Sequence, residues 1–280
     1  RISQYSNTQN KVSAADFFSN HPFHLRVEEL SRQVWAPLKK GAVDQTHWFY
    51  ERARGQYANQ QANLTTAQKK LYLRQNPRAQ MFTKTDLAKF ILSFEELPHE
   101  VSLGAQKAFA GSARSPGFVG RIAKEWEKDN GRTFNELWFK RAIAKAICFR
   151  KVDRLVFQQD WYGGYKANIV TYTLAKFASM VRETGRHVDF MKIWELQGIS
   201  DPLEFKLEEI AEAVNNILVN PPKNTTANVS EWAKKPECWE AVKEASLKLG
   251  GGLDAFLIDH EESTERESDA KTTQVIRDNI

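Results

Sequence analysis

The sequence predicts a mainly α-helical, multi-helix globular fold with one small β element near residues 46–57. Apolar residues recur at helical spacing along most of the chain. Residues that favour helix starts and stops stand between these stretches, and one aromatic segment has the composition of a strand instead. Hydrophobic residues make up 41% of the 280 residues and aromatic residues 11%, which excludes a disordered chain and is enough for a large core.

In chain order, the apolar spacing predicts five helices before a long helix at the middle of the chain. The five lie near residues 13–34, 66–75, 84–96, 101–112 and 117–129. The long helix lies near 134–158. Thr133 and Glu136 have the spacing of a capping box, in which each side chain satisfies a backbone donor of the other residue.

Start and stop signals divide the second half of the chain into shorter helices. One is expected near 169–185. Ser200, followed by an aspartate and a proline, is expected to cap the next helix, near 202–218. Two short helical segments follow, carrying Trp232 and Trp239, before a run of three glycines closes this part of the chain.

Residues 48–57, with the sequence WFYERARGQY, are the exception to the helical pattern and are expected to be extended. An extended chain would place alternate residues on one face: Trp48, Tyr50, Arg52, Arg54 and Gln56. Rings and guanidinium planes stack on bases, and guanidinium groups hold phosphates, so this face is a candidate nucleic-acid contact. In the alternative interpretation, Glu51 pairs with the arginines and the aromatic residues fill the core.

A second candidate contact is the polar run Asn7-Thr8-Gln9-Asn10. The side-chain amides of Asn7, Gln9 and Asn10 can read base edges, and they can equally clamp a local turn. The sequence leaves both roles open, and we group these three residues with the 48–57 segment as candidate contacts.

Positive charge is concentrated in the first half of the sequence. Residues 1–150 hold 24 Lys and Arg against 13 Asp and Glu, whereas residues 151–280 hold 16 against 22. We therefore divide the chain into a basic region (1–130), a helical region (131–258) and a polar, acidic tail (259–280). A basic region can bind nucleic-acid phosphates and release their counterions. It can also dock on another protein region, another subunit or a second copy of this chain.

The cysteine and hydropathy patterns indicate a cytoplasmic protein without a membrane span. Two cysteines cannot form a disulfide framework, and we expect buried free thiols in a reducing compartment. No stretch approaches the roughly 20 apolar residues that a membrane-spanning helix needs.

The sequence contains no group of residues that assembles into a recognisable catalytic site, which leaves enzymatic activity open. Glu204 and Lys206, close to Asp201, match the Glu-x-Lys motif of metal-dependent nucleases. They follow a helix start, however, where the helix dipole favours an acidic residue. His21 and His24 have no cysteine or acidic cluster beside them, so we expect neither a metal site nor a cofactor.

Five phrases of the sequence, taken in order, match the pattern of one protein family. They are NTQNKV followed by Asp16-Phe17, WFYERARGQY, TKTDLAK, PHEVSLGAQK and GGYKANIVTYT, at residues 7–17, 48–57, 83–89, 98–107 and 163–173. They resemble the bacterial abortive-infection phage-resistance (AIPR) proteins. The resemblance implies an intracellular defence protein. Longer members resemble a restriction-endonuclease-type nuclease region followed by the region seen here, so the chemistry is expected upstream of this sequence.

Two functions are consistent with these observations. In the first, the chain is the nucleic-acid-binding and regulatory region of a phage-defence protein. In the second, it is a protein-interaction or structural helical module without nucleic-acid binding, and its basic half docks on the nuclease region or another subunit.

Overall fold

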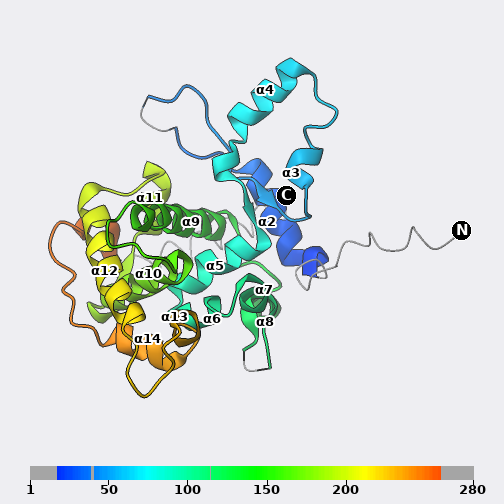
Figure 1. Cartoon of the computed structure of the whole chain (residues 1–280). Helices are drawn as coiled ribbons and strands as arrows, with labels where there is room; N and C mark the ends of the chain where they lie inside the picture. Colours follow the sequence, from blue (N-terminus) through cyan, green and yellow to red (C-terminus); the bar gives the residue numbers. More distant parts are fainter. Residues whose placement is uncertain (1–17, 39–40, 114, 260–280) are drawn as a thin grey trace, which may run out of the picture.

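Two long helices, α9 (Glu136–Phe157) and α10 (Lys166–Glu183), form the centre of the computed structural model, which describes residues 18–38, 41–113 and 115–259 (Figure 1). Thirteen of the 18 residues of α10 are buried. A helix that is buried on most sides needs neighbours all round. These neighbours include α9, α5 (Lys84–Phe94) and α12 (Asp201–Val219).

Shorter helices complete the described part of the chain around this centre. On the N-terminal side they are α2 (Pro22–Gln33), α3 (Gln56–Asn59), α4 (Thr66–Gln75), α6 (Pro98–Val101), α7 (Ala105–Ala110) and α8 (Gly117–Asp129). On the C-terminal side they are α11 (Phe190–Leu196), α13 (Val229–Trp232) and α14 (Pro236–Lys243). Three 3-10 turns are η1 (Phe18–Asn20), η2 (Arg78–Gln80) and η3 (Asp254–Phe256).

The strands form two small sheets. β1 (Tyr50–Glu51) pairs in parallel with β2 (Phe82–Thr83), which confirms the predicted β element near 46–57. β3 (Arg186–Val188) pairs antiparallel with β4 (Leu257–Asp259), a sheet that the sequence did not predict. The mainly helical fold class is thereby confirmed.

Most predicted helices occur close to their predicted bounds, and local signals explain why. α4 and α8 begin and end at the predicted residues. Thr65 caps α4 in a capping box with Gln68, in which the Thr65 hydroxyl accepts the Gln68 N–H and the Gln68 side chain accepts the Thr65 N–H.

The predicted capping box at Thr133 is wrong. Asn135 caps α9 instead, and its side chain accepts the backbone N–H of Trp138. The Thr133 N–H and hydroxyl both donate to the carboxylate of Asp129, 2.9 and 2.6 Å away. A carboxylate one turn back was therefore the stronger partner for Thr133.

The helix predicted over 101–112 is present as the shorter α7 (105–110), but its predicted start is wrong, because α6 ends at Val101 and a turn separates the two helices. Gly104 has a φ of 101°, which a helix cannot accommodate, and its carbonyl accepts the first hydrogen bond of α7 from Ala108. At the cap predicted for α12, Ser200 does precede the helix, but its hydroxyl makes no capping hydrogen bond.

Both cysteines are buried free thiols, as predicted. Burial raises the pKa of Cys148 to about 12 and that of Cys238 to about 11, so both stay protonated at neutral pH. Among the described helices, none is both long and apolar enough to span a bilayer.

Candidate nucleic-acid interface

The 48–57 segment divides into a buried half and a surface half. Trp48 and Tyr50 are 5% and 0% exposed. The Trp48 indole N–H donates to Gln197 Oε1 over 2.9 Å, and the Tyr50 hydroxyl lies 2.6 Å from His24 Nδ1. These two rings therefore belong to the core, and neither is available as a stacking surface for bases.

The shared face expected for the alternate residues of this segment does not form. The chain is a strand only at Tyr50–Glu51, and it then turns at Gly55, where φ is 81°, into α3. The carboxylate of Glu51 closes this turn by accepting the backbone N–H groups of Gly55 and Tyr57, each over 3.2 Å. Arg52 and Gln56 consequently turn toward α2, where both contact Glu28, whereas Arg54 is exposed.

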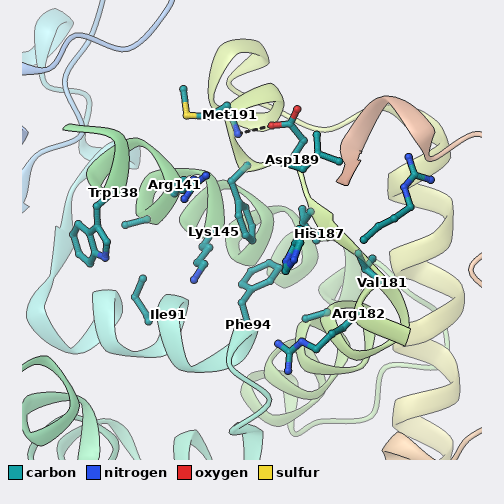
Figure 2. A pocket seen from close by; sticks show the side chains of 16 residues that line it. Ile91, Phe94, Trp138, Arg141, Lys145, Val181, Arg182, His187, Asp189 and Met191 are labelled. Atoms are coloured by element: carbon teal, nitrogen blue, oxygen red, sulfur yellow. Dashed lines mark hydrogen bonds between the residues drawn. The ribbon is translucent and has the colours of Figure 1, made fainter. Parts of the chain in front are cut away.

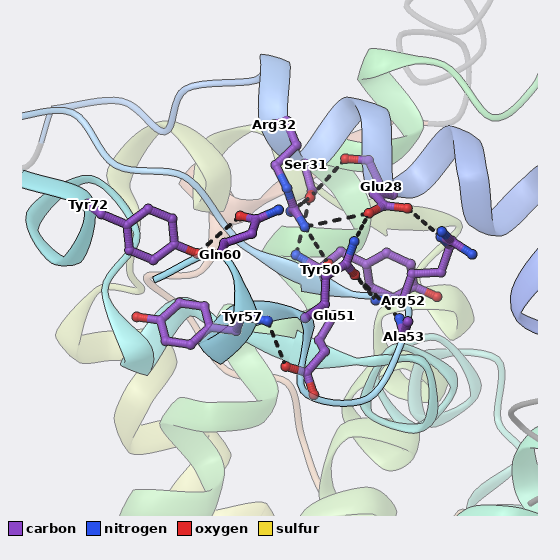
Figure 3. Close-up of polar contacts among 11 residues, drawn as sticks. Glu28, Ser31, Arg32, Tyr50, Glu51, Arg52, Ala53, Tyr57, Gln60 and Tyr72 are labelled. Carbon is purple, nitrogen blue, oxygen red and sulfur yellow. Dashed lines mark hydrogen bonds and ion pairs between the residues drawn. The ribbon is translucent and has the colours of Figure 1, made fainter. Parts of the chain in front are cut away.

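Glu28 of α2 is the acidic partner at the centre of this region, as Figure 3 shows. It forms an ion pair with Arg52, accepts a hydrogen bond from the Gln56 amide and lies 3.9 Å from Arg32. The expectation that Glu51 would pair with the arginines is thus corrected. Because Arg52 and Gln56 are half-buried in this network, they hold α2 to the 48–57 segment.

Arg32 ties the network to the strand. Its guanidinium donates to the carbonyl oxygen of Tyr50 over 3.0 Å and stacks 3.5 Å above the ring of Phe49. Burial lowers the pKa of Arg32, while Glu28 and Tyr72 oppose this effect. The Arg32 guanidinium keeps its charge because it stacks on the Phe49 ring and lies near the Glu28 carboxylate. It therefore holds the strand in place through the Tyr50 carbonyl and is not a free cation.

His24 lies below this network as a neutral core residue. It is 2% exposed, and burial lowers its pKa to about 3, with Lys84, His21 and Arg52 adding smaller effects in the same direction. Burial raises the pKa of Tyr50 well above its ordinary value. The pair is therefore an uncharged, hydrogen-bonded contact at neutral pH.

Beyond Arg52 the chain leaves the body as a projecting element, which we call the basic arm and define as residues 52–80. It contains α3, α4 and η2, and Figure 1 shows α4 standing away from the central helices. No residue of α4 is buried. From residue 52 to residue 85 the sequence contains no Asp, Glu or His but seven cationic residues: Arg52, Arg54, Lys69, Lys70, Arg74, Arg78 and Lys84.

Four cations of the basic arm are exposed and form no ion pair with any described residue. They are Arg54, Lys69, Lys70 and Arg78. Arg74 is different, because its Nε lies 2.9 Å from Asp44 Oδ2. The aromatic rings of the arm are engaged internally: the Tyr57 hydroxyl donates to the carbonyl of Asn76, and the Tyr72 hydroxyl donates to Gln60.

A cleft of about 550 Å³ extends this positive surface from the base of the basic arm to α9. Arg150 of α9 donates to the carbonyls of Ala79 and Met81 and lies 5.0 Å above the ring of Trp48. Arg154, one turn further along α9, also lines the cleft and is exposed. Arg150 thus joins the arm to the body, and Arg154 adds an exposed cation beside the arm.

Of the eight predicted contact residues, Arg54 is the one that the structure places on an open surface within the described ranges. Asn7, Gln9 and Asn10 lie outside the described residues, so the structure does not address them. Sequence reasoning missed Lys69, Lys70 and Arg78, although the 34-residue stretch without a carboxylate was visible in the sequence.

Glu204 and Lys206, the residues that match the nuclease motif, form separate contacts in the fold. Glu204 lies in the first turn of α12 and pairs with Lys151 over 2.7 Å. Lys206 pairs with Glu209 and donates to the carbonyl of Lys248 over 2.9 Å. This agrees with the interpretation of Glu204 as a residue at a helix start.

Comparison with protein families decides the identity of the chain. The family model described as AIPR protein matches residues 1–222. The chain belongs to the AIPR family. The family is associated with abortive-infection phage resistance. The match in this AIPR protein includes the basic arm, α9 and α10, and it ends shortly after α12. No curated protein and no solved structure matches the chain.

Proposed function

We propose that this chain is the nucleic-acid-binding and regulatory region of an abortive-infection phage-defence protein, and that the basic arm makes the contact. The observation that carries the proposal is the 34-residue stretch without a carboxylate, which presents four exposed cations: Lys69 and Lys70 on the projecting helix α4, Arg54 just before α3 and Arg78 in η2. Such a surface binds phosphates because each contact releases condensed counterions.

Duplex DNA is the partner that the arm fits best. Its two tyrosines are engaged within the arm, so it offers phosphates positive charge without offering bases a ring for stacking. An isolated helix fits the major groove of B-form DNA, which is about 12 Å wide, whereas the major groove of A-form RNA is too narrow. The glutamines and asparagines that accompany the cations can donate to phosphate oxygens.

The proposed arrangement places the nuclease chemistry of the defence system in an upstream region, as the resemblance to longer family members implies. In this arrangement the binding region would position the upstream nuclease region on DNA. We further propose a cytoplasmic location, because phage DNA enters the cytoplasm and both cysteines are free thiols.

The test is fluorescence anisotropy of a labelled DNA duplex at several salt concentrations, with single-stranded DNA and double-stranded RNA for comparison. A fourfold variant, Arg54→Gln, Lys69→Gln, Lys70→Gln and Arg78→Gln, removes the exposed charges of the arm. If all four cations contact phosphates, the slope of log affinity against log salt should fall by about 3 to 4.

A matched control removes four exposed cations elsewhere: Lys124, Arg132, Lys223 and Lys248. Both variants lose the same net charge, so a contact by the arm changes the slope in the first variant and leaves it largely intact in the second. Equal losses would assign the binding to overall charge. Absence of DNA binding at low salt by a folded wild-type sample would exclude the proposal.

The second candidate function, a protein-interaction module, is favoured by one observation on the same arm. Leu71 and Leu73 are 49% and 41% exposed, next to the cations. A protein partner would cover these leucines. Leu71→Ser with Leu73→Ser should then abolish association with the upstream region in a pull-down experiment, whereas DNA binding through phosphates should survive this change.

A further inference from the structure

A second positively charged feature lies inside the body, away from the basic arm. It is a cavity of about 280 Å³ among α5, α9, α10 and the segment from β3 into α11 (Figure 2). Its walls combine apolar side chains such as Phe94, Trp138 and Phe190 with four cations: Arg141, Lys145, Arg182 and Arg186. Asp189 is the one carboxylate among the lining residues. The cavity therefore has the chemical character of a site for an anion with an apolar part.

Lys145 is the least satisfied of these cations. Its Nζ lies 5.3 Å from the ring centroid of Phe190 and 6.0 Å from that of Phe94, and Figure 2 shows it at the centre of the lining side chains. Among the described residues it has these ring contacts but no hydrogen bond or ion pair. An ammonium group has three N–H donors, and those of the half-buried Lys145 have no acceptor among the described residues.

The surroundings of Lys145 disfavour its charge. Burial lowers the pKa of Lys145, and Arg141 and Arg182 lower it further, whereas Glu95 raises it. An anion in the cavity would reverse this situation, because it would supply both an acceptor and the missing negative charge.

The other charged groups of the cavity already have partners in the fold. Arg182 pairs with Glu96 over 2.7 Å, and Arg186 pairs with Asp254 over 2.8 Å. The Asp189 carboxylate caps α11 by accepting the N–H groups of Met191 and Lys192, over 3.0 and 3.1 Å. The position with unused binding capacity is thus at Lys145.

We propose that this cavity binds a small organic anion, whose carboxylate or phosphate group contacts Lys145 and whose compact apolar part packs against Phe94 and Phe190. Arg141 lies one helical turn before Lys145 on α9 and faces the same cavity, so it is placed to contact the anion as well. The site is independent of DNA binding by the basic arm, because it lies on other elements and is far smaller than a duplex.

The test uses isothermal titration calorimetry of the whole chain with four probes: phenyl phosphate, benzoate, inorganic phosphate and neutral benzyl alcohol. The two aromatic anions should bind, inorganic phosphate should bind more weakly and benzyl alcohol should not bind measurably. The ratio of the phenyl phosphate and benzoate affinities distinguishes a phosphate site from a carboxylate site.

Lys145→Met keeps the length of the side chain and removes its charge, so the affinity for the aromatic anions should fall at least tenfold. Lys140→Met is the control, because Lys140 is on the same helix, pairs with Glu136 and does not line the cavity. If Lys145→Met fails to fold, Phe190→Ala provides a second variant that should weaken the aromatic anions more than inorganic phosphate. Two results would overturn the proposal: undiminished binding by folded Lys145→Met, or no binding of either aromatic anion to the wild type at about 10 mM, a concentration roughly ten-thousandfold above a micromolar Kd.

Discussion

The basic arm and the cavity at Lys145 both concentrate positive charge, but they hold it in opposite surroundings. Arg54, Lys69, Lys70 and Arg78 point into solvent from an element that buries little. Lys145 is half-buried beside the rings of Phe94 and Phe190, and burial lowers its pKa. The exposed cations stay hydrated and change the free energy of unfolding little, whereas the half-buried Lys145 lowers it unless a bound anion pairs with its charge.

This difference teaches how one type of residue can serve two kinds of recognition. Exposed charges are screened by salt and contribute little one at a time, so they suit a polyanion that several of them contact together. An enclosed charge interacts strongly with a single counter-charge, so it suits a small ligand. Four predictions test the distinction, from the largest expected effect to the smallest.

The largest effect is expected from pH, and it should come from the body rather than from the arm. His24 titrates near 6.5 when unfolded and near 3 when folded, so the unfolded chain binds more protons between these values. The contribution of His24 to the free energy of unfolding should therefore be fully present above pH 6.5. It should fall below that pH, by about 2 kcal/mol at pH 5 and on the order of 4 kcal/mol at pH 3. The arm contains no Asp, Glu or His, so its side chains do not change the pH dependence of stability in this range.

Urea unfolding of the wild type and His24→Gln at pH 7.5 and pH 5 measures this contribution. The variant should be less stable at pH 7.5, because the contact with Tyr50 is disturbed, but it should lose about 2 kcal/mol less than the wild type on acidification. An identical loss in the two proteins would show that His24 is not the group responsible.

The next largest effect is expected at Arg150, which connects the arm to the body. Arg150→Ala removes hydrogen bonds to two carbonyls and the contact with Trp48, and we expect a loss of about 3 kcal/mol in the free energy of unfolding. Arg150→Lys should lose less, because it retains charge and one donor. Chemical denaturation measures both values, and Arg154→Ala, an exposed neighbour, should change stability by less than about 0.5 kcal/mol.

A smaller effect of opposite sign is expected at Lys145. Without a ligand, Lys145→Met should stabilise the fold by about 1 to 2 kcal/mol, since it replaces an unpaired enclosed charge by an apolar side chain. The fourfold arm variant should leave stability within about 0.5 kcal/mol of the wild type. Thermal unfolding in ligand-free buffer checks both, and a destabilised Lys145→Met would mean that the ammonium supports the fold.

The smallest effect is expected within the arm itself. Thr65→Ala removes the capping box of α4 and should cost about 1 kcal/mol, confined to this helix because α4 buries no residue. Amide hydrogen exchange should therefore become about fivefold faster in α4, with unchanged exchange in α10. Faster exchange in α10 as well as in α4 would show that the arm and the body unfold together.

The sequence predicted features that depend on residues close together in the chain. The bounds of α4 follow from Thr65 and Gln68, three positions apart, and the helical fold class follows from apolar spacing. The family resemblance also rests on contiguous phrases. The concentration of charge in the first half led toward the basic arm, but not to Lys69, Lys70 or Arg78.

The tertiary structure decided which segments meet, and with this which side chains are free to act. Glu28 pairs with Arg52, 24 positions along the chain, and β3 pairs with β4, about 70 positions along the chain. Neither pairing therefore has a signal in the local sequence. The same segment supplies buried Tyr50 and exposed Arg54, because its strand ends after two residues. Lys145 is spaced like any other lysine of a helix, and its unsatisfied charge arises because α5, α10 and α11 enclose it. Burial and pairing depend on the whole packed chain, whereas capping and periodicity depend on a few neighbouring residues.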